Sequence, residues 1–264
     1  MQRDGVVIAG EEAGEGTPVV GLHGLTATRR YVIMGSRSLE RSGHRVVLYD
    51  ARGHGRSGPA ADPESYTYED LAADLLAVLD DRGIEQAVLA GASMGAHTIL
   101  RFALDQPERV AGLVVVTPAF EPGAERDLER WDALSEGLRR GGVEGFVEAY
   151  GEPPVPESYK ETVFRILRQR LSAHEHPEAV ADALQAVPRA APLGSWEELE
   201  RIDAPAVVVA SRDDADPEHP YAVGERYAEA IPGAELRSEE PGESPLAWQG
   251  GQLSKVIAEL ASKA

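Results

Sequence analysis

The chain has 264 residues with 42% hydrophobic and 27% charged content, which suits one large globular domain or one domain with an insertion. Its net charge of −19 argues against nucleic acids and anionic membrane surfaces as partners, because both would repel it. The absence of cysteine excludes disulfides, thiolate metal sites and a cysteine nucleophile.

The chain begins with residues 1–5, which lack the long apolar segment of a secretory signal peptide. No apolar run in the sequence approaches the ~20 residues that are needed to span a bilayer. We therefore expect a soluble, cytoplasmic protein.

Short apolar runs alternate with helical patterns along most of the chain. The expected strands cover residues 6–9, 19–22, 45–49, 88–90, 112–117, 205–210 and 234–238. Helical patterns follow at 29–41, 67–83 and 253–260, and Thr67 with Asp70 resembles a capping box. Continuous Val and Leu runs separated by helices are typical of a parallel sheet that is covered on both faces. The sequence therefore predicts an α/β fold with a doubly wound, mostly parallel sheet.

Residues 118–199 show a different pattern, without a strand of the Val-rich kind. Helical stretches are expected around 128–140, 143–150, 159–171 and 179–187. We predict that this segment is a helical cap inserted into a core formed by residues 1–117 and 200–264.

The sequence Gly91-Ala92-Ser93-Met94-Gly95 lies between an apolar run and an amphipathic helical pattern. This Gly-x-Ser-x-Gly context predicts a nucleophile elbow, a sharp strand-to-helix turn that exposes the serine. The glycines relieve backbone crowding, and the N–H of Met94 would point at an oxyanion formed beside Ser93. His23 and Asp50 also follow predicted strands, so all three should meet at one sheet edge, where such sheets bind ligands.

Three motifs in this order resemble the α/β-hydrolase fold superfamily, in its cap-bearing branch with a serine nucleophile. They are His23-Gly24, the Asp-x-Arg-Gly-His-Gly-x-Ser run at 50–57, and the Gly-x-Ser-x-Gly of the elbow. The resemblance covers essentially the whole chain, and the helical insertion matches the cap of that family.

The resemblance implies an oxyanion hole formed by the backbone N–H groups of Leu25 and Met94. It also implies that His23 and His54 shape loops and do not transfer protons. Epoxide hydrolases and haloalkane dehalogenases of this fold use an aspartate where this chain has Ser93, so those two chemistries are disfavoured.

The family places its acid in a loop where Asp213, Asp214 and Asp216 compete in this chain. The usual Gly-x-x-Asp spacing, with Ser211 in place of the glycine, selects Asp214. The spacing back from Pro220 selects Asp216 instead. We prefer Asp214 and keep Asp216 as the alternative.

The family's general base is a histidine after the last strand, where this chain has Glu243, and no histidine follows His219. A serine hydroxyl is a poor nucleophile until a base takes its proton. In the first hypothesis His219 is a relocated base, oriented by Asp214 or Asp216. In the second, Glu243 is the base of a lyase, isomerase or cyclase.

In a third hypothesis the site is catalytically silent and binds a ligand between cap and core. We favour hydrolysis of an ester or thioester, on a small and largely apolar carbonyl compound, through Ser93. No metal or organic cofactor is expected, because the histidines lack ligand spacing and no dinucleotide-binding glycine motif is present. The sequence does not predict an oligomeric state.

Overall fold

The computed structural model describes residues 1–263, and its centre is a seven-stranded sheet with the strand order β3-β5-β4-β6-β7-β8-β9. All neighbouring pairs are parallel except β3–β5, which confirms the predicted fold class. The strands are β3 (Gly10–Ala13), β4 (Thr17–Leu22), β5 (His44–Tyr49), β6 (Ala87–Ala92), β7 (Val110–Val116), β8 (Ala206–Val209) and β9 (Glu235–Arg237). A separate hairpin pairs β1 (Gln2–Arg3) with β2 (Val6–Val7).

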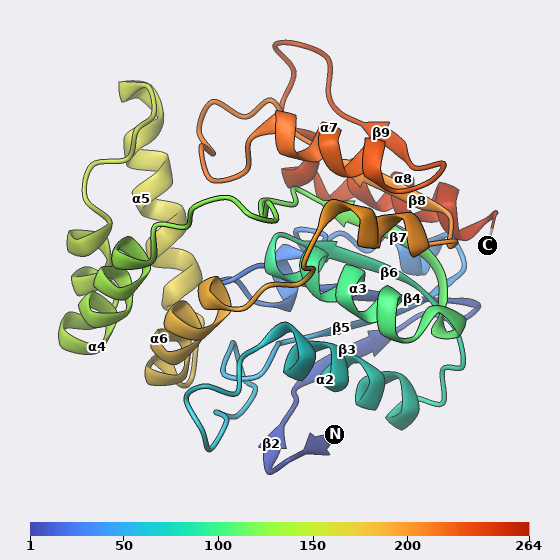
Figure 1. Cartoon of the computed structure of the whole chain (residues 1–264), viewed down its shortest axis with the longest axis horizontal. Coiled ribbons are helices and arrows are strands. Elements are labelled where there is room, and N and C mark those ends of the chain that lie inside the picture. The colour runs from blue at the N-terminus through green and yellow to red at the C-terminus, as the bar shows by residue number, and fades with distance from the viewer. Residues whose placement is uncertain (264) are drawn as a thin grey trace.

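Helices cover both faces of this sheet (Figure 1). The helices of the core are α1 (Ser38–Arg41), α2 (Tyr68–Asp81), α3 (Met94–Asp105), α7 (Tyr221–Ala230) and α8 (Gly250–Ala261). Neighbouring strand residues alternate between two apolar clusters, so that Val20 packs with α2, α3 and α7 whereas Val19 packs with α8. Burial on both faces explains why the strands are continuous apolar runs in the sequence.

Two predictions in the first 50 residues are wrong. The expected helix 29–41 is only a 3₁₀ turn, η1 (Arg29–Tyr31), followed by the short α1, because Met34 (φ +48°) and Gly35 (φ +71°) break the helical path. The segment 10–18, where no strand is expected between the predicted strands 6–9 and 19–22, contains β3 and the start of β4. This edge strand of Gly, Glu, Glu and Ala is mostly exposed, so it carries no alternation of apolar residues that would reveal it.

The capping box at the start of α2 is confirmed. Thr67 Oγ1 accepts a hydrogen bond from the Asp70 N–H at 3.2 Å, and the Asp70 carboxylate accepts one from the Thr67 N–H at 3.3 Å. The helix ends at Asp81, shortly before Gly83, whose φ of +63° is incompatible with a continuing helix.

Helices α4 (Leu128–Tyr150), α5 (Glu157–Leu171) and α6 (Pro177–Ala186) form the insertion between β7 and β8. They lie together to one side of the sheet, near the loop that follows β8 (Figure 1). They share a small apolar cluster of their own: Leu134, Leu138, Phe146, Leu171, Val180, Ala181 and Leu184. Gly142, with φ +59°, interrupts α4 between the two helical stretches that the sequence indicates.

The remaining short helices are 3₁₀ turns: η2 (Pro107–Arg109), η3 (Val187–Arg189), η4 (Trp196–Arg201) and η5 (Leu246–Trp248). Leu199 of η4 packs in the core cluster, so the chain returns to the sheet domain shortly before residue 200. The division into a separate core and cap stays a prediction. Within residues 1–263, no helix is long and apolar enough to cross a membrane.

Candidate active site

Ser93 lies at the junction of β6 and α3 in a backbone conformation that L-residues rarely adopt, with φ 52° and ψ −112°. A Cβ atom at Gly91 would overlap the carbonyl oxygen of Gly95, and one at Gly95 would overlap that of Leu22. Both positions therefore require glycine. The turn leaves Ser93 half-buried at the N-terminus of α3.

The loop after β4 lies directly against this serine. A Cβ atom at Gly24 would be 3.2 Å from Ser93 Cβ and 3.8 Å from the hydroxyl oxygen, and Leu25 is the next residue in the chain. Met94 is the first residue of α3, so its N–H has no acceptor one turn earlier within the helix. The two amides assigned to the oxyanion hole thus belong to the residues that directly follow Gly24 and Ser93, and their role stays a prediction.

His23 and His54 are buried beside this loop and hold it in place. His23 Nε2 accepts the Ala51 N–H at 2.9 Å, and its Nδ1 donates to the Gly24 carbonyl at 2.8 Å. Burial lowers the pKa of His23 to about 4. His54 Nδ1 donates to the Arg52 carbonyl at 2.9 Å. These contacts agree with the expectation that both residues shape loops.

His174, between α5 and α6, packs against His54 with ring centroids 5.5 Å apart. His174 joins the loop after β4 to the turn after β5, because it accepts the Gly55 N–H at 2.8 Å and donates to the Thr26 carbonyl at 3.0 Å. Despite this gathering of histidines, no three ligating side chains within residues 1–263 are placed to hold a metal ion.

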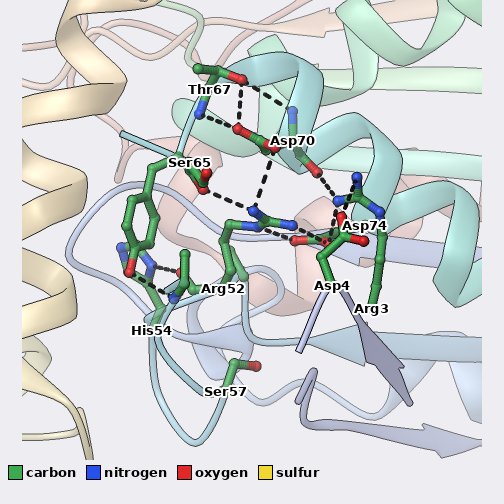
Figure 2. A network of polar contacts seen from close by, with 12 residues as sticks. Arg3, Asp4, Arg52, His54, Ser57, Ser65, Thr67, Asp70 and Asp74 are labelled. Carbon is green, nitrogen blue, oxygen red and sulfur yellow. Dashed lines mark hydrogen bonds and ion pairs between the residues drawn. The ribbon is translucent and has the colours of Figure 1, made fainter. Parts of the chain in front are cut away.

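The turn that contains His54 is anchored by a buried ion pair (Figure 2). Arg52 donates from Nε to one carboxylate oxygen of Asp74 and from a terminal nitrogen to the other, both at 2.7 Å. Arg52 also donates to the Ser65 carbonyl at 2.8 Å, and Arg3 adds a bond of 3.1 Å to Asp74. The Arg52 and Asp74 side chains are 2% and 1% exposed, so the arginine of this motif is a structural residue.

His219 is paired with a carboxylate, and the acid is Asp216. His219 Nδ1 lies 2.8 and 2.9 Å from the two carboxylate oxygens. Burial works to raise the pKa of Asp216, but the hydrogen bond and charge of His219 outweigh it, so the pKa falls below its usual value. Asp214, the preferred acid, is instead exposed and is not the partner of His219.

His97 is a further buried histidine close to the nucleophile in the chain. It is on α3 one turn beyond Ser93, and its Nε2 accepts the N–H groups of Ala119 and Phe120 at 3.2 and 3.1 Å. Burial and, to a smaller extent, the charge of His219 lower the pKa of His97 to about 3. His97 is therefore occupied as a loop anchor that the sequence did not reveal.

Glu243 lies on the exposed loop between β9 and α8. Its carboxylate accepts the Glu240 N–H of the same loop at 3.4 Å. The buried acid of this loop is Glu239, which accepts the N–H groups of Arg212 and Leu246 and so holds the loop to the segment after β8. In the described part of the chain, neither Glu243 nor His219 is hydrogen-bonded to Ser93 Oγ.

Comparison with known proteins assigns the family. The model of the alpha/beta hydrolase fold family matches residues 17–173, and the chain belongs to this family. A putative carbamate hydrolase RutD of Variovorax paradoxus is 33% identical over 195 residues, covering 74% of this chain and 72% of that protein. A 2-hydroxy-6-oxononadienedioate/2-hydroxy-6-oxononatrienedioate hydrolase of Pseudomonas putida is 33% identical over 239 residues, covering 85% and 80%.

A solved structure shows the same architecture. The malate-bound thermophilic esterase of Thermogutta terrifontis superposes with a TM-score of 0.79 at 28% identity, covering 97% of this chain and 93% of that one. These relatives are hydrolases, which supports hydrolase chemistry in general for this chain.

Proposed function

We propose that the protein is a serine hydrolase that cleaves an ester or thioester of a small carbonyl compound with a largely apolar body. The observation that carries this proposal is the hydrogen-bonded pair of His219 and Asp216, which supplies a base to a chain that lacks the usual C-terminal histidine. A triad is defined by its geometry and not by the order of its members in the chain.

In the proposed mechanism Ser93 Oγ attacks the substrate carbonyl while its proton passes to His219 Nε2. Nδ1 of His219 keeps its proton because it donates to Asp216, which leaves the Nε2 lone pair free. The oxyanion is held by the N–H groups of Leu25 and Met94. His219 then protonates the leaving alcohol or thiol, and a water molecule hydrolyses the acyl-Ser93 ester by the same steps in reverse.

Catalytic hydrogen bonds are often long in proteins without substrate and tighten when substrate binds. The missing bond between Ser93 and His219 is therefore compatible with this mechanism. The names of the relatives also favour it, since they include an esterase and a hydrolase of a carbonyl compound. Glu243 is disfavoured as the base, because an exposed carboxylate lacks the burial that would raise its proton affinity.

Hydrolysis of p-nitrophenyl esters with two- to six-carbon acyl chains tests the proposal. We expect the wild-type protein to turn over at least one of them. Ser93→Ala should lower kcat by about 10⁴-fold or more, because the nucleophile is lost. Glu243→Gln should change kcat less than about twofold. A folded wild-type protein that hydrolyses none of the esters would contradict the proposal, and a large loss in Glu243→Gln would favour the carboxylate base.

A further inference from the structure

Arg170, near the end of α5, carries a cation without a direct partner among the described residues. Its Nε is buried without a hydrogen-bond partner within residues 1–263, and no carboxylate there forms an ion pair with its guanidinium. Other cap arginines do have acid partners: Arg130 with Glu218, Arg139 with Asp182, Arg168 with Glu144 and Arg189 with Asp132. Burying a cation without such a partner is costly, so its retention calls for an explanation.

Two aromatic rings fix the position of this guanidinium at the border between cap and core. Its central carbon lies 5.2 Å from the ring centroid of Tyr31 and 5.6 Å from that of Trp248. Stacking on rings suits the flat guanidinium and leaves its edge N–H groups free to donate. Arg170 is therefore oriented while its hydrogen-bonding capacity stays unused.

Trp248 connects Arg170 to the proposed catalytic pair of His219 and Asp216. The Trp248 ring packs against His219 with centroids 6.4 Å apart, and its Nε1 donates to Asp213 at 2.8 Å. Burial lowers the pKa of Arg170, whereas the charge of Asp216 raises it, so the two charges are near each other. The carboxylate of Asp216 is itself hydrogen-bonded to His219, which leaves Arg170 without a direct partner.

We propose that Arg170 binds a carboxylate of the substrate, so that the substrate is an ester or thioester of a short dicarboxylic acid. Its free carboxylate would pair with Arg170 while its scissile carbonyl lies at Ser93. A guanidinium binds a carboxylate through two parallel hydrogen bonds. Because the net charge of −19 repels anions from the protein as a whole, capture of such a substrate requires a local cation. This inference rests on the proposed function and names its substrate class.

Two esters of matched length test it: p-nitrophenyl butyrate and the mono-p-nitrophenyl ester of succinic acid. The measured quantity is the ratio of kcat/KM for the charged ester to that for the neutral one. Arg170→Met, which keeps the length of the side chain without its charge, should lower this ratio about 10- to 100-fold. Arg170→Lys should lower it less. Arg165→Met, at an exposed arginine of the same helix, is the matched control and should leave the ratio unchanged.

Binding of glutarate, measured by calorimetry, separates this inference from the proposed function. Wild-type protein should bind glutarate and Arg170→Met should not, even if neither ester is hydrolysed. The Tm of Arg170→Met should stay equal or rise, because an unpaired charge is removed. An unchanged ester ratio, or equal glutarate binding by both proteins, would overturn the inference. A lower Tm with an unchanged ratio would assign Arg170 a structural role instead.

Discussion

Replacing His219 with alanine is expected to lower kcat/KM for an ester by about 10⁴- to 10⁶-fold, the range found when the histidine of a serine protease triad is removed. The reason is that the proposed mechanism passes the Ser93 proton to His219, the imidazole that a carboxylate orients. His23 and His97 have their ring acceptors occupied by backbone N–H groups. Steady-state hydrolysis of the best p-nitrophenyl ester measures the effect.

Matched variants show whether the loss comes from catalysis. His176→Ala removes an exposed histidine of the cap and should leave kcat/KM within about twofold of wild type. Asp216→Asn should cost about 10⁴-fold, because the His219 ring would lose its orientation, whereas Asp214→Asn should cost little. The opposite result, a large loss only in Asp214→Asn, would return the acid to the position that the sequence favours.

Replacing Arg52 with leucine is expected to lower the free energy of unfolding by about 3–5 kcal/mol. Asp74 would then remain almost fully buried with only the bond from Arg3. The turn that carries His54 would also lose its anchor to the start of α2. Urea unfolding followed by circular dichroism measures this change through the midpoint and slope.

Two comparisons make this stability prediction specific. Arg37→Ala removes an exposed pair with Glu40 and should cost less than about 1 kcal/mol. The double variant Arg52→Leu with Asp74→Leu should be more stable than Arg52→Leu alone, because no buried charge is left unpaired. A loss of less than about 1 kcal/mol in Arg52→Leu would show that the network does not hold the turn.

Most of the sheet and the helices between β7 and β8 could be predicted because their residues repeat with the period of the element that they form. The Val-rich strands are buried on both faces, and the cap helices have amphipathic patterns. Elements without a pattern were missed or wrongly predicted. The edge strand β3 has almost no apolar residue, and the break at Met34 depends on a backbone conformation that residue type does not reveal.

The candidate site shows the same distinction between residues that belong to a sequence motif and residues whose partners depend on the fold. The elbow around Ser93 was predictable, because the crowding at Gly91 and Gly95 permits only glycine. The acid partner of His219 could not be predicted, because the sequence does not show which of three aspartates in one loop turns its side chain toward this histidine. Arg170 could not be singled out either. In the sequence it resembles the exposed arginines of its helix, and only the fold shows that it lacks an acid partner.

The account depends on His219 activating Ser93, and labelling by a fluorophosphonate probe tests this most directly. The probe phosphonylates a serine only when a base takes the hydroxyl proton, and intact-mass and peptide spectra identify the modified residue. We predict that wild-type protein is labelled at Ser93 and that His219→Ala reacts at least about 100-fold more slowly while keeping the same Tm. Equal labelling rates in the two proteins, or a folded wild-type protein that is not labelled, would contradict the account.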